Sequence, residues 1–414
     1  MKKQDLFEEN EKNKISLDLF QAYFDARKNK RNTINALAFE KYAEANIFAL
    51  FNEIIEFDYE PYPSICFIVD KPVKREIFAA DFRDRLVHHF IFNYISPVFE
   101  KLFIIDSYSC RLAKGVHYGV SRVNHFIKSC SNNYYGECYI LKLDILGYFM
   151  AINKDLLFDK IKQVLSADNK IVEFNVNLLI YLIEKTIFND PRKNCIVKGS
   201  RDSWKGLPKT KSLFYVQENC GLPIGNLTSQ LFANIYMNDF DHWVKNDLGI
   251  KYYGRYVDDF ILIHENKHYL QSLIPKISDF LSSNLKLTLH PNKIYLQHYS
   301  KGVKFLGTVI KPHRIYIANR TKGNFYDAIE KQNKIIKDHK PSLEEQKVFQ
   351  SCINSYLGIM KHYKTYKIRK NYLLKYLNAN WWNYFYMSGG FEKFVFKRKI
   401  QNKKALRFKQ NYSF

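Results

Sequence analysis

The stretch GRYVDDFILIH, residues 254–264, places two adjacent aspartates inside a run of strand-forming residues. Aromatic and branched apolar residues flank Asp258 and Asp259 on both sides, which predicts a β-hairpin with buried strands. Two like charges at such a turn repel each other and resist burial unless a positive group compensates them. An isolated pair of this kind is more often a solvated turn, because aspartate is a common turn residue. The fold must therefore expose this hairpin tip or bring a cation to it.

The segment ECYILKLDILGYF, residues 137–149, supplies a third carboxylate. The segment is typical of a strand, and Asp144 stands at the strand's end. If this strand and the hairpin belong to one sheet, Asp144, Asp258 and Asp259 come together. Proteins bind Mg²⁺ through one or two carboxylates, water and substrate phosphates. Two such ions can hold the attacking and leaving oxygens of an in-line phosphoryl transfer, so the three acids indicate a two-metal site.

The charge of the chain agrees with a phosphate-rich substrate. The 414 residues include 64 lysines and arginines against 41 acidic residues, a formal net charge of +23. Such an excess indicates a polyanionic partner, most often nucleic acid, although a solubilising basic surface would also produce it. A hydrophobic content of 46% indicates a well-filled core rather than disorder.

Cysteine usage and the N-terminus bear on the compartment. The seven cysteines have no C-x-x-C spacing, which argues against a disulfide framework or a zinc site and is typical of a reducing environment. The first residues are too charged for a signal peptide, and no apolar run approaches the ~20 residues of a membrane span. We expect a soluble cytoplasmic protein.

Hydrophobic periodicity divides the chain into a helical front, a mixed centre and a helical, basic back. Helices are expected at 36–57, 86–95 (ending near Pro97), 155–188 and 268–283, and strands at 137–144, 251–264 and 293–317. A basic loop with glycines covers 192–211. This order predicts the α+β class.

Six ordered segments resemble the reverse transcriptase family. YVDD (256–259) matches its Y-x-D-D box, and LKLDILGYF (141–149) resembles its first palm motif. The other segments are SYSCRLAKG (107–115), GLPIGNLTSQLFANIY (221–236), LTLHPNK (287–293) and GVKFLGTVI (302–310). One four-letter box is weak support for a family, whereas six segments in the family's order over residues 74–310 are strong support.

Within that family, three segments look like the reverse transcriptases of diversity-generating retroelements: REIFAADFRDRLVHH (75–89), DSYSCRLAKGVH (106–117) and GLPIGNLTSQLFANIYMNDFDHWVK (221–245). Group II intron and retron enzymes usually carry L-P-Q-G where this chain has Leu222-Pro223-Ile224-Gly225. The chain also shows no recognisable endonuclease or RNase H domain. A retron-like or phage-defence reverse transcriptase remains the alternative, and a catalytically inactive RNA-binding scaffold is the third reading.

The resemblance implies a right-hand polymerase fold with fingers, a palm built on an antiparallel sheet, and a helical thumb. We expect an N-terminal helical extension at residues 1–72, fingers at 73–136, a palm at 137–312 with a fingers insertion at about 155–215, and a basic thumb and tail at 313–414. The tail 391–414 holds eight basic residues against Glu392, and these would contact phosphates. Trp381 and Trp382 either stack on bases or belong to a helical core.

The resemblance also assigns the catalytic residues. Asp144 and Asp258 would bind two Mg²⁺ ions, with Mn²⁺ as a possible substitute, and Asp259 would complete the site. Lys293 corresponds to a lysine proposed to protonate the departing pyrophosphate. Ordinary turn and surface roles are the alternatives.

Further residues are expected at the nucleotide. Arg111 and Lys114 would hold the triphosphate, unless they belong to a solvated basic loop. Phe149 would lie under the sugar and exclude a 2′-hydroxyl by its size, unless it is an ordinary core residue. Gly225 would let the backbone approach the base pair closely. Ile224 replaces a glutamine that can hydrogen-bond near the nucleotide, which should weaken the geometric check on pairing.

Together these features predict an RNA-templated DNA polymerase that makes error-prone, adenine-mutagenised cDNA from a retroelement template RNA. The expected partners are template RNA, the cDNA or primer, dNTPs and a small basic accessory variability protein. A prokaryotic or phage-encoded protein is implied.

Overall fold

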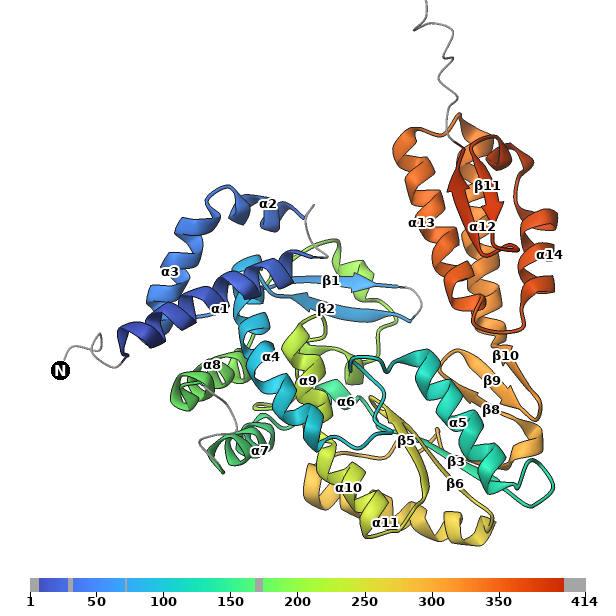
Figure 1. Ribbon diagram of the computed structural model, residues 1–414, viewed down its shortest axis with the longest axis horizontal. Helices are drawn as coiled ribbons and strands as arrows, with labels where there is room; N and C mark the ends of the chain where they lie inside the picture. Colours follow the sequence, from blue (N-terminus) through green and yellow to red (C-terminus); the bar gives the residue numbers. More distant parts are fainter. Residues whose placement is uncertain (1–6, 29–32, 71–72, 168–173, 398–414) are drawn as a thin grey trace, which may run out of the picture. The chain divides into compact units, whose positions relative to one another are not determined.

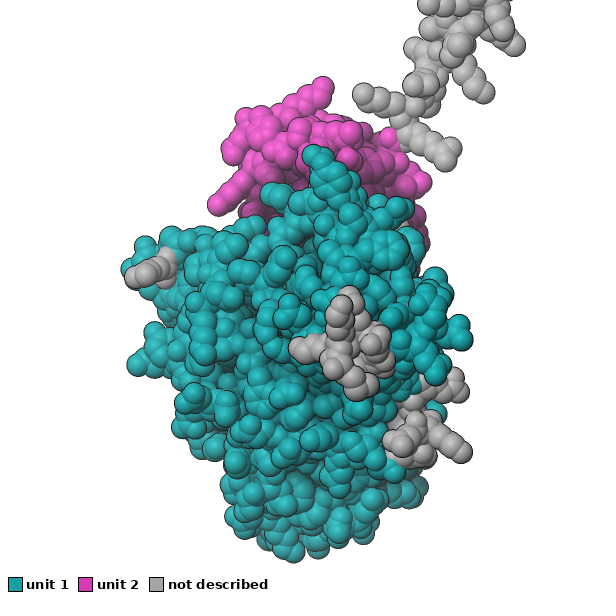
Figure 2. All heavy atoms as spheres, turned by 90° about the vertical axis from the view of Figure 1, so that its left-hand side faces the viewer, with its two compact units in different colours: residues 1–298 teal, residues 299–414 magenta. Residues whose placement is uncertain are grey.

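The computed structural model describes residues 7–28, 33–70, 73–167 and 174–397. The chain forms two compact units, Met1–His298 and Tyr299–Phe414, which Figure 2 colours teal and magenta. Most of the predicted basic tail, from Arg398 onward, lies outside the described residues. Among the described residues, no helix combines the length and the apolar character that crossing a membrane requires.

The first unit begins with helices. The predicted helix at 36–57 is two helices, because Tyr42 leaves the helical backbone region between them. The helix expected to end near Pro97 instead continues through this proline to Leu102, since Val98 and Phe99 extend its buried side beyond the missing N–H. The helices are α1 (Glu9–Arg27), α2 (Ile34–Glu40), α3 (Ala43–Ile55), α4 (Phe82–Leu102), α7 (Lys154–Ser166) and α8 (Val176–Phe188).

A three-stranded sheet follows the first helices (Figure 1). Strand β1 (Ile65–Val69) pairs antiparallel with β2 (Arg75–Ala79) and parallel with the short β4 (Ile196–Val197). Three 3₁₀ turns lie between β4 and the next α-helix: η2 (Arg201–Trp204), η3 (Lys209–Lys211) and η4 (Leu213–Tyr215).

The central sheet has the order β5-β6-β3-β7, and all its neighbouring strands are antiparallel. Its strands are β3 (Tyr139–Asp144), β5 (Tyr252–Tyr256), β6 (Asp259–His264) and β7 (Tyr295–His298). The helices around it are α5 (Val116–Cys130), α6 (Tyr148–Ala151), α9 (Leu227–Tyr236), α10 (Asn238–Asn246) and α11 (Lys267–Leu285). Apolar residues of β3 and β6 alternate into one large core with α4, α8, α9 and α11. The α+β class with an antiparallel central sheet is therefore confirmed.

A buried ion pair fixes the β5–β6 hairpin to α10. The side chains of Arg255 and Asp241 are fully buried, and the Arg255 Nε lies 2.7 Å from Asp241 Oδ1. The hydroxyl of Tyr253 donates to the same carboxylate at 2.6 Å. The guanidinium also donates, at 3.1 Å, to the carbonyl of Val257, the residue just before the acidic pair. Removing one partner of such a buried pair typically lowers folding stability by about 3–5 kcal/mol, so the pair holds the hairpin firmly against α10.

The second unit has its own core. A small sheet of β8 (Val303–Phe305), β9 (Thr308–Lys311) and β10 (Arg314–Ile317) precedes α12 (Asn319–Asp338), α13 (Leu343–Met360) and α14 (Tyr366–Tyr376). After the 3₁₀ turn η6 (Ala379–Asn383), β11 (Phe385–Ser388) pairs with β12 (Lys393–Phe396). The fully buried Trp381 stacks on Phe349 at 4.0 Å between ring centroids, so this tryptophan belongs to the core. Trp382 packs against Phe394.

The second unit begins at Tyr299, so the predicted thumb boundary at residue 313 falls inside the first sheet of this unit. The assignment of fingers, palm and thumb to these segments stays a prediction.

Candidate active site

The structure brings the three predicted acids to one end of the central sheet. Asp144, the last residue of β3, pairs in register with Asp259, the first residue of β6. Asp258 lies in the hairpin turn, and its carbonyl accepts from the N–H of Ile145 at 3.2 Å. Val257 in the same turn has φ 58°, a left-handed conformation that branched side chains rarely adopt. Such strain is often found at functional sites, where the surrounding structure enforces it.

The two acids of the hairpin hold their protons more tightly than free carboxyl groups do. Burial raises the pKa of Asp258 to about 6, and the neighbouring charges of Asp144 and Asp259 add to this shift. Burial also raises the pKa of Asp259, while Lys142 opposes that rise. A cluster that resists its own ionisation in this way gains most from a cation.

Two lysines contact the cluster. Lys293 Nζ lies 2.8 Å from Asp144 Oδ1, which places this predicted residue at the acids. Lys142 Nζ lies 3.0 Å from Asp259 Oδ2, and the sequence analysis missed this residue. The signal was present in the strand pattern: Lys142 precedes Asp144 by two positions, so both side chains leave the same face of β3.

The donor set suits a magnesium ion. Asp259 Oδ1 is buried and has no hydrogen-bond partner, so a lone pair remains for a cation. Among the described residues, no group of three or more acidic, histidine or cysteine side chains is arranged so that it alone could hold a metal ion. Mg²⁺ does not require such a group, because it takes part of its shell from water and substrate phosphates. The ligand roles of Asp144, Asp258 and Asp259 stay predictions, and the carboxylates fit them.

Phe149 and Ile224 pack against the same small apolar cluster, which includes the buried Phe78. The N–H of Phe78 donates to the carbonyl of Ile224 at 2.9 Å, and the N–H of Leu222 donates to that of Phe149 at 2.8 Å. The loop that carries Ile224 is therefore tied both to β2 and to the segment after Asp144.

Glycine is required at position 225 because the loop backbone there lies very close to other atoms of the protein itself. A Cβ at this position would lie 2.9 Å from Ile77 Cγ2 and 3.1 Å from the Phe78 carbonyl oxygen, and φ is 129°. Both the space and the backbone conformation favour glycine. The structure thus assigns this glycine to the packing of its loop on β2, and contact with a base pair stays a prediction.

Arg111 lies in a different environment from the predicted one. Its side chain is 6% exposed, and its Nε lies 2.9 Å from Glu100 Oε1. Its NH1 donates to the carbonyls of Ile104 and Ser107. These contacts make it a support for its own loop and do not support triphosphate binding. Lys114 donates to the carbonyl of Ile105 at 3.0 Å and lies over the ring of Tyr118.

Arg75 offers a cation that the sequence analysis did not single out. Its side chain is exposed on β2, and its positive charge lowers the pKa of Tyr256 in the hairpin, against the larger effect of burial. Arg75 thus acts on the residue that precedes Val257 and the two acids. The only available signal was its position at the start of the segment REIFAADFRDR.

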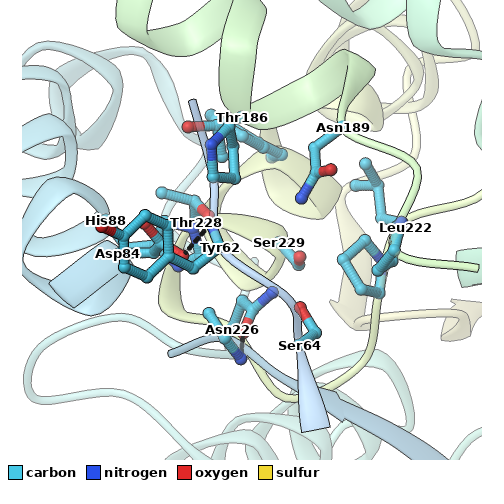
Figure 3. A pocket seen from close by; sticks show the side chains of 15 residues that line it. Tyr62, Ser64, Asp84, His88, Thr186, Asn189, Leu222, Asn226, Thr228 and Ser229 are labelled. Carbon is cyan, nitrogen blue, oxygen red and sulfur yellow. Dashed lines mark hydrogen bonds between the residues drawn. The ribbon is translucent and has the colours of Figure 1, made fainter. Parts of the chain in front are cut away.

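A small cavity of mixed polar and apolar lining is bordered in part by Leu222 and Pro223 (Figure 3). Tyr62, Asp84, His88, Asn226, Thr228 and Ser229 are among the residues that line it. It leaves about 20 Å³ for the centres of water molecules, room for about one or two. A nucleotide does not fit, so the candidate active site is the open end of the sheet.

The central antiparallel sheet thus presents Asp144, Asp258 and Asp259 at one end, with helices packed against it. Residues 74–310, more than half of the chain, match the family described as reverse transcriptase (RNA-dependent DNA polymerase). The chain belongs to this family and is an RNA-directed DNA polymerase.

Individual relatives are distant. Protein YkfC of Escherichia coli (strain K12) is 23% identical over 293 residues, which cover 62% of this chain and 68% of that protein. Among solved structures, apo telomerase from Candida tropicalis gives a TM-score of 0.47 at 13% identity, covering 76% of this chain and 59% of the telomerase chain. The same telomerase truncated from its C-terminal domain gives 0.44 at 16% identity, covering 64% and 59%.

Proposed function

We propose that this reverse transcriptase copies a retroelement template RNA into cDNA that carries errors concentrated at template adenines, as diversity-generating retroelements require. The observation that carries the proposal is the environment of Ile224. Its side chain packs in an apolar cluster with Phe78 and Phe149 and offers no hydrogen bond to a nucleotide. A site that recognises pairing by shape alone discriminates less than one that would leave a polar group unsatisfied by a wrong pair.

Nucleotide addition takes place at the three acids. Bound Mg²⁺ ions would supply charge neutralisation for the attacking 3′-oxygen, the transferred phosphate and the leaving pyrophosphate. Asp144 at the end of β3 and Asp258 in the β5–β6 turn would hold these ions, and Asp259 would add its unpaired Oδ1. Because the hairpin rests on the buried Arg255–Asp241 pair, the carboxylates are fixed before the substrate arrives.

Two cations of the chain assist this step. Lys293, which lies against Asp144, is placed to give a proton to pyrophosphate as it leaves. Arg75 on β2, whose positive charge acts on Tyr256 of the hairpin, would bind the triphosphate, the role expected of Arg111. Phe149, which packs on the same apolar cluster as Ile224, would exclude ribonucleotides by its size.

The proposed partners are the template RNA, the primer or cDNA, and a small basic accessory variability protein. The strongly positive chain is compatible with RNA, and its electrostatic attraction should weaken as salt is added. A cytoplasmic location belongs to the same proposal.

The test is primer extension on a defined RNA template, followed by sequencing of the cDNA. The proposal expects misincorporation opposite adenine to exceed that opposite the other three bases. Ile224→Gln should reduce errors at adenine, and Ile224→Leu, which keeps an apolar side chain, should not. An error rate that is equal at all four template bases contradicts the proposal and favours a retron-like or defence enzyme.

A further inference from the structure

Residues 190–216, here called the strap, supply β4 at the edge of the three-stranded sheet, and the two ends of the strap lie close together. β4 lies in this segment and pairs with β1, where Ile196 N–H donates to the carbonyl of Ser64 at 2.8 Å. Arg192 donates from NH1 to the carbonyl of Val216 at 3.2 Å, which joins the two ends of the strap. The segment therefore has a defined position on the sheet although it contains only short elements.

A single buried carboxylate anchors the strap to β2. Glu76 is 1% exposed and accepts three hydrogen bonds, all of them from strap residues. The donors are Trp204 Nε1 at 2.6 Å, Ser212 Oγ at 2.8 Å and the N–H of Leu213 at 2.6 Å. Burial of an unpaired carboxylate is unfavourable, whereas hydrogen bonds to a charged acceptor are short and strong. The strap and Glu76 thus depend on each other.

The inner side of the strap forms part of the wall of the candidate nucleotide site. A Cβ on Gly147 would lie 2.6 Å from the Thr210 carbonyl oxygen, so the strap touches the segment just before Phe149. Leu213 belongs to the buried apolar cluster against which Phe149 and Ile224 pack, and Trp204 and Val216 of the strap pack against the same cluster. Arg75, the neighbour of Glu76 in β2, faces the opposite side of that strand.

We propose that the strap, held by Glu76, is a specificity element that fixes Phe149 and thereby sets the discrimination between deoxyribonucleotides and ribonucleotides. The inference rests on the proposed position of Phe149 under the sugar. A gate that works by size depends on a ring that does not move, since a small displacement opens room for one hydroxyl. Glu76 itself is a positioning residue: its three bonds reach the strap, and the strap supplies Leu213 to the cluster on which Phe149 packs and contacts the backbone at Gly147.

The experiment compares kcat/KM for dGTP and for GTP opposite a template cytosine, with Mg²⁺ and an RNA template. This base avoids the adenines on which the proposed mutagenic role depends. Glu76→Gln keeps the shape of the side chain but turns one acceptor oxygen into an NH₂ group that faces donors. We expect the preference for dGTP to fall about tenfold, a typical size for the loss of one positioning contact. Lys198→Ala, an exposed strap residue, is the matched control and should leave the preference unchanged.

The ratio of the two kcat/KM values does not depend on the fraction of active enzyme, so partial unfolding alone cannot change it. If Glu76→Gln does not fold, Trp204→Phe removes one donor and keeps the aromatic packing. Phe149→Ala distinguishes the proposed role of the strap from the proposed position of Phe149 under the sugar. A lower preference in Phe149→Ala with an unchanged preference in Glu76→Gln and Trp204→Phe overturns the role of the strap. An unchanged preference in all three overturns the position of Phe149 under the sugar, and the inference with it.

Discussion

The ionised side chain of Asp258 should destabilise the metal-free folded protein. Its pKa is raised from 3.8 to about 6 by burial and by repulsion from Asp144. Since one pKa unit corresponds to about 1.4 kcal/mol, the ionised carboxylate costs the metal-free folded state up to about 3 kcal/mol. The side chain keeps some contact with solvent, which makes this value an upper bound. Asp258→Asn removes the charge and keeps the shape, so it should raise the free energy of unfolding.

The pH dependence of this gain follows from the direction of the shift. The folded protein holds the proton of Asp258 more tightly than the unfolded chain does. The cost of ionisation is therefore absent below about pH 4, grows between pH 4 and pH 6, and is complete above pH 6. Asp258→Asn should stabilise the metal-free protein by about 2–3 kcal/mol at pH 8 and by about half as much at pH 5.

Urea unfolding in EDTA at the two pH values measures the difference. Asp279→Asn, at an exposed position of α11, is the control and should change the unfolding free energy by less than about 0.5 kcal/mol. Added Mg²⁺ should stabilise the wild type and have a smaller effect on Asp258→Asn, because a ligand stabilises only the state that binds it. A variant that is equally or less stable than the wild type at pH 8 would refute the reasoning about the buried charge.

Three further substitutions test other contacts of the site. Arg111→Ala should lower the free energy of unfolding by about 2–4 kcal/mol, because Glu100 and two carbonyls lose their partner. The KM for dNTPs should stay nearly unchanged. A large rise in KM with unchanged thermal stability would instead support the predicted role of Arg111 at the triphosphate. Lys142→Met should lower the Mg²⁺ concentration for half-maximal synthesis several-fold, since its ammonium competes with the cation for Asp259, and a higher requirement for Mg²⁺ would show that it supports binding instead. Lys293→Ala should reduce single-turnover incorporation by about 10²-fold with little change in dNTP affinity, the size expected for the loss of a general acid. An equal loss in Lys293→Arg, which keeps the positive charge, would show that charge alone does not replace the lysine. Unchanged rates in Lys293→Ala would exclude the role.

The sequence was sufficient to predict that Asp144, Asp258 and Asp259 lie at the same end of one sheet, because these residues stand in local patterns. A strand that ends in Asp144 and a hairpin that encloses Asp258 and Asp259 could be read from periodicity alone, and their resemblance to one family put them in one sheet. The α+β class followed from the same patterns.

Contacts between distant segments could not be predicted in this way. Arg111 stands in a family-like segment, yet its partner Glu100 is part of a helix whose orientation no local pattern specifies. The three donors to Glu76 come from residues more than a hundred positions away. Trp381 left two readings open until its stacking on Phe349 placed it in the core of the second unit.

The most direct test of the account is the number of divalent ions that the three acids hold together. Bound Mn²⁺, which has a spectroscopic signal, can be counted in the complex of the protein with an RNA template, a DNA primer and an unreactive dNTP analogue. The account predicts two ions for the wild type and fewer for both Asp144→Asn and Asp258→Asn, with RNA affinity retained, because each ion depends on β3 and on the hairpin at once. Two ions retained in either variant would contradict a shared site.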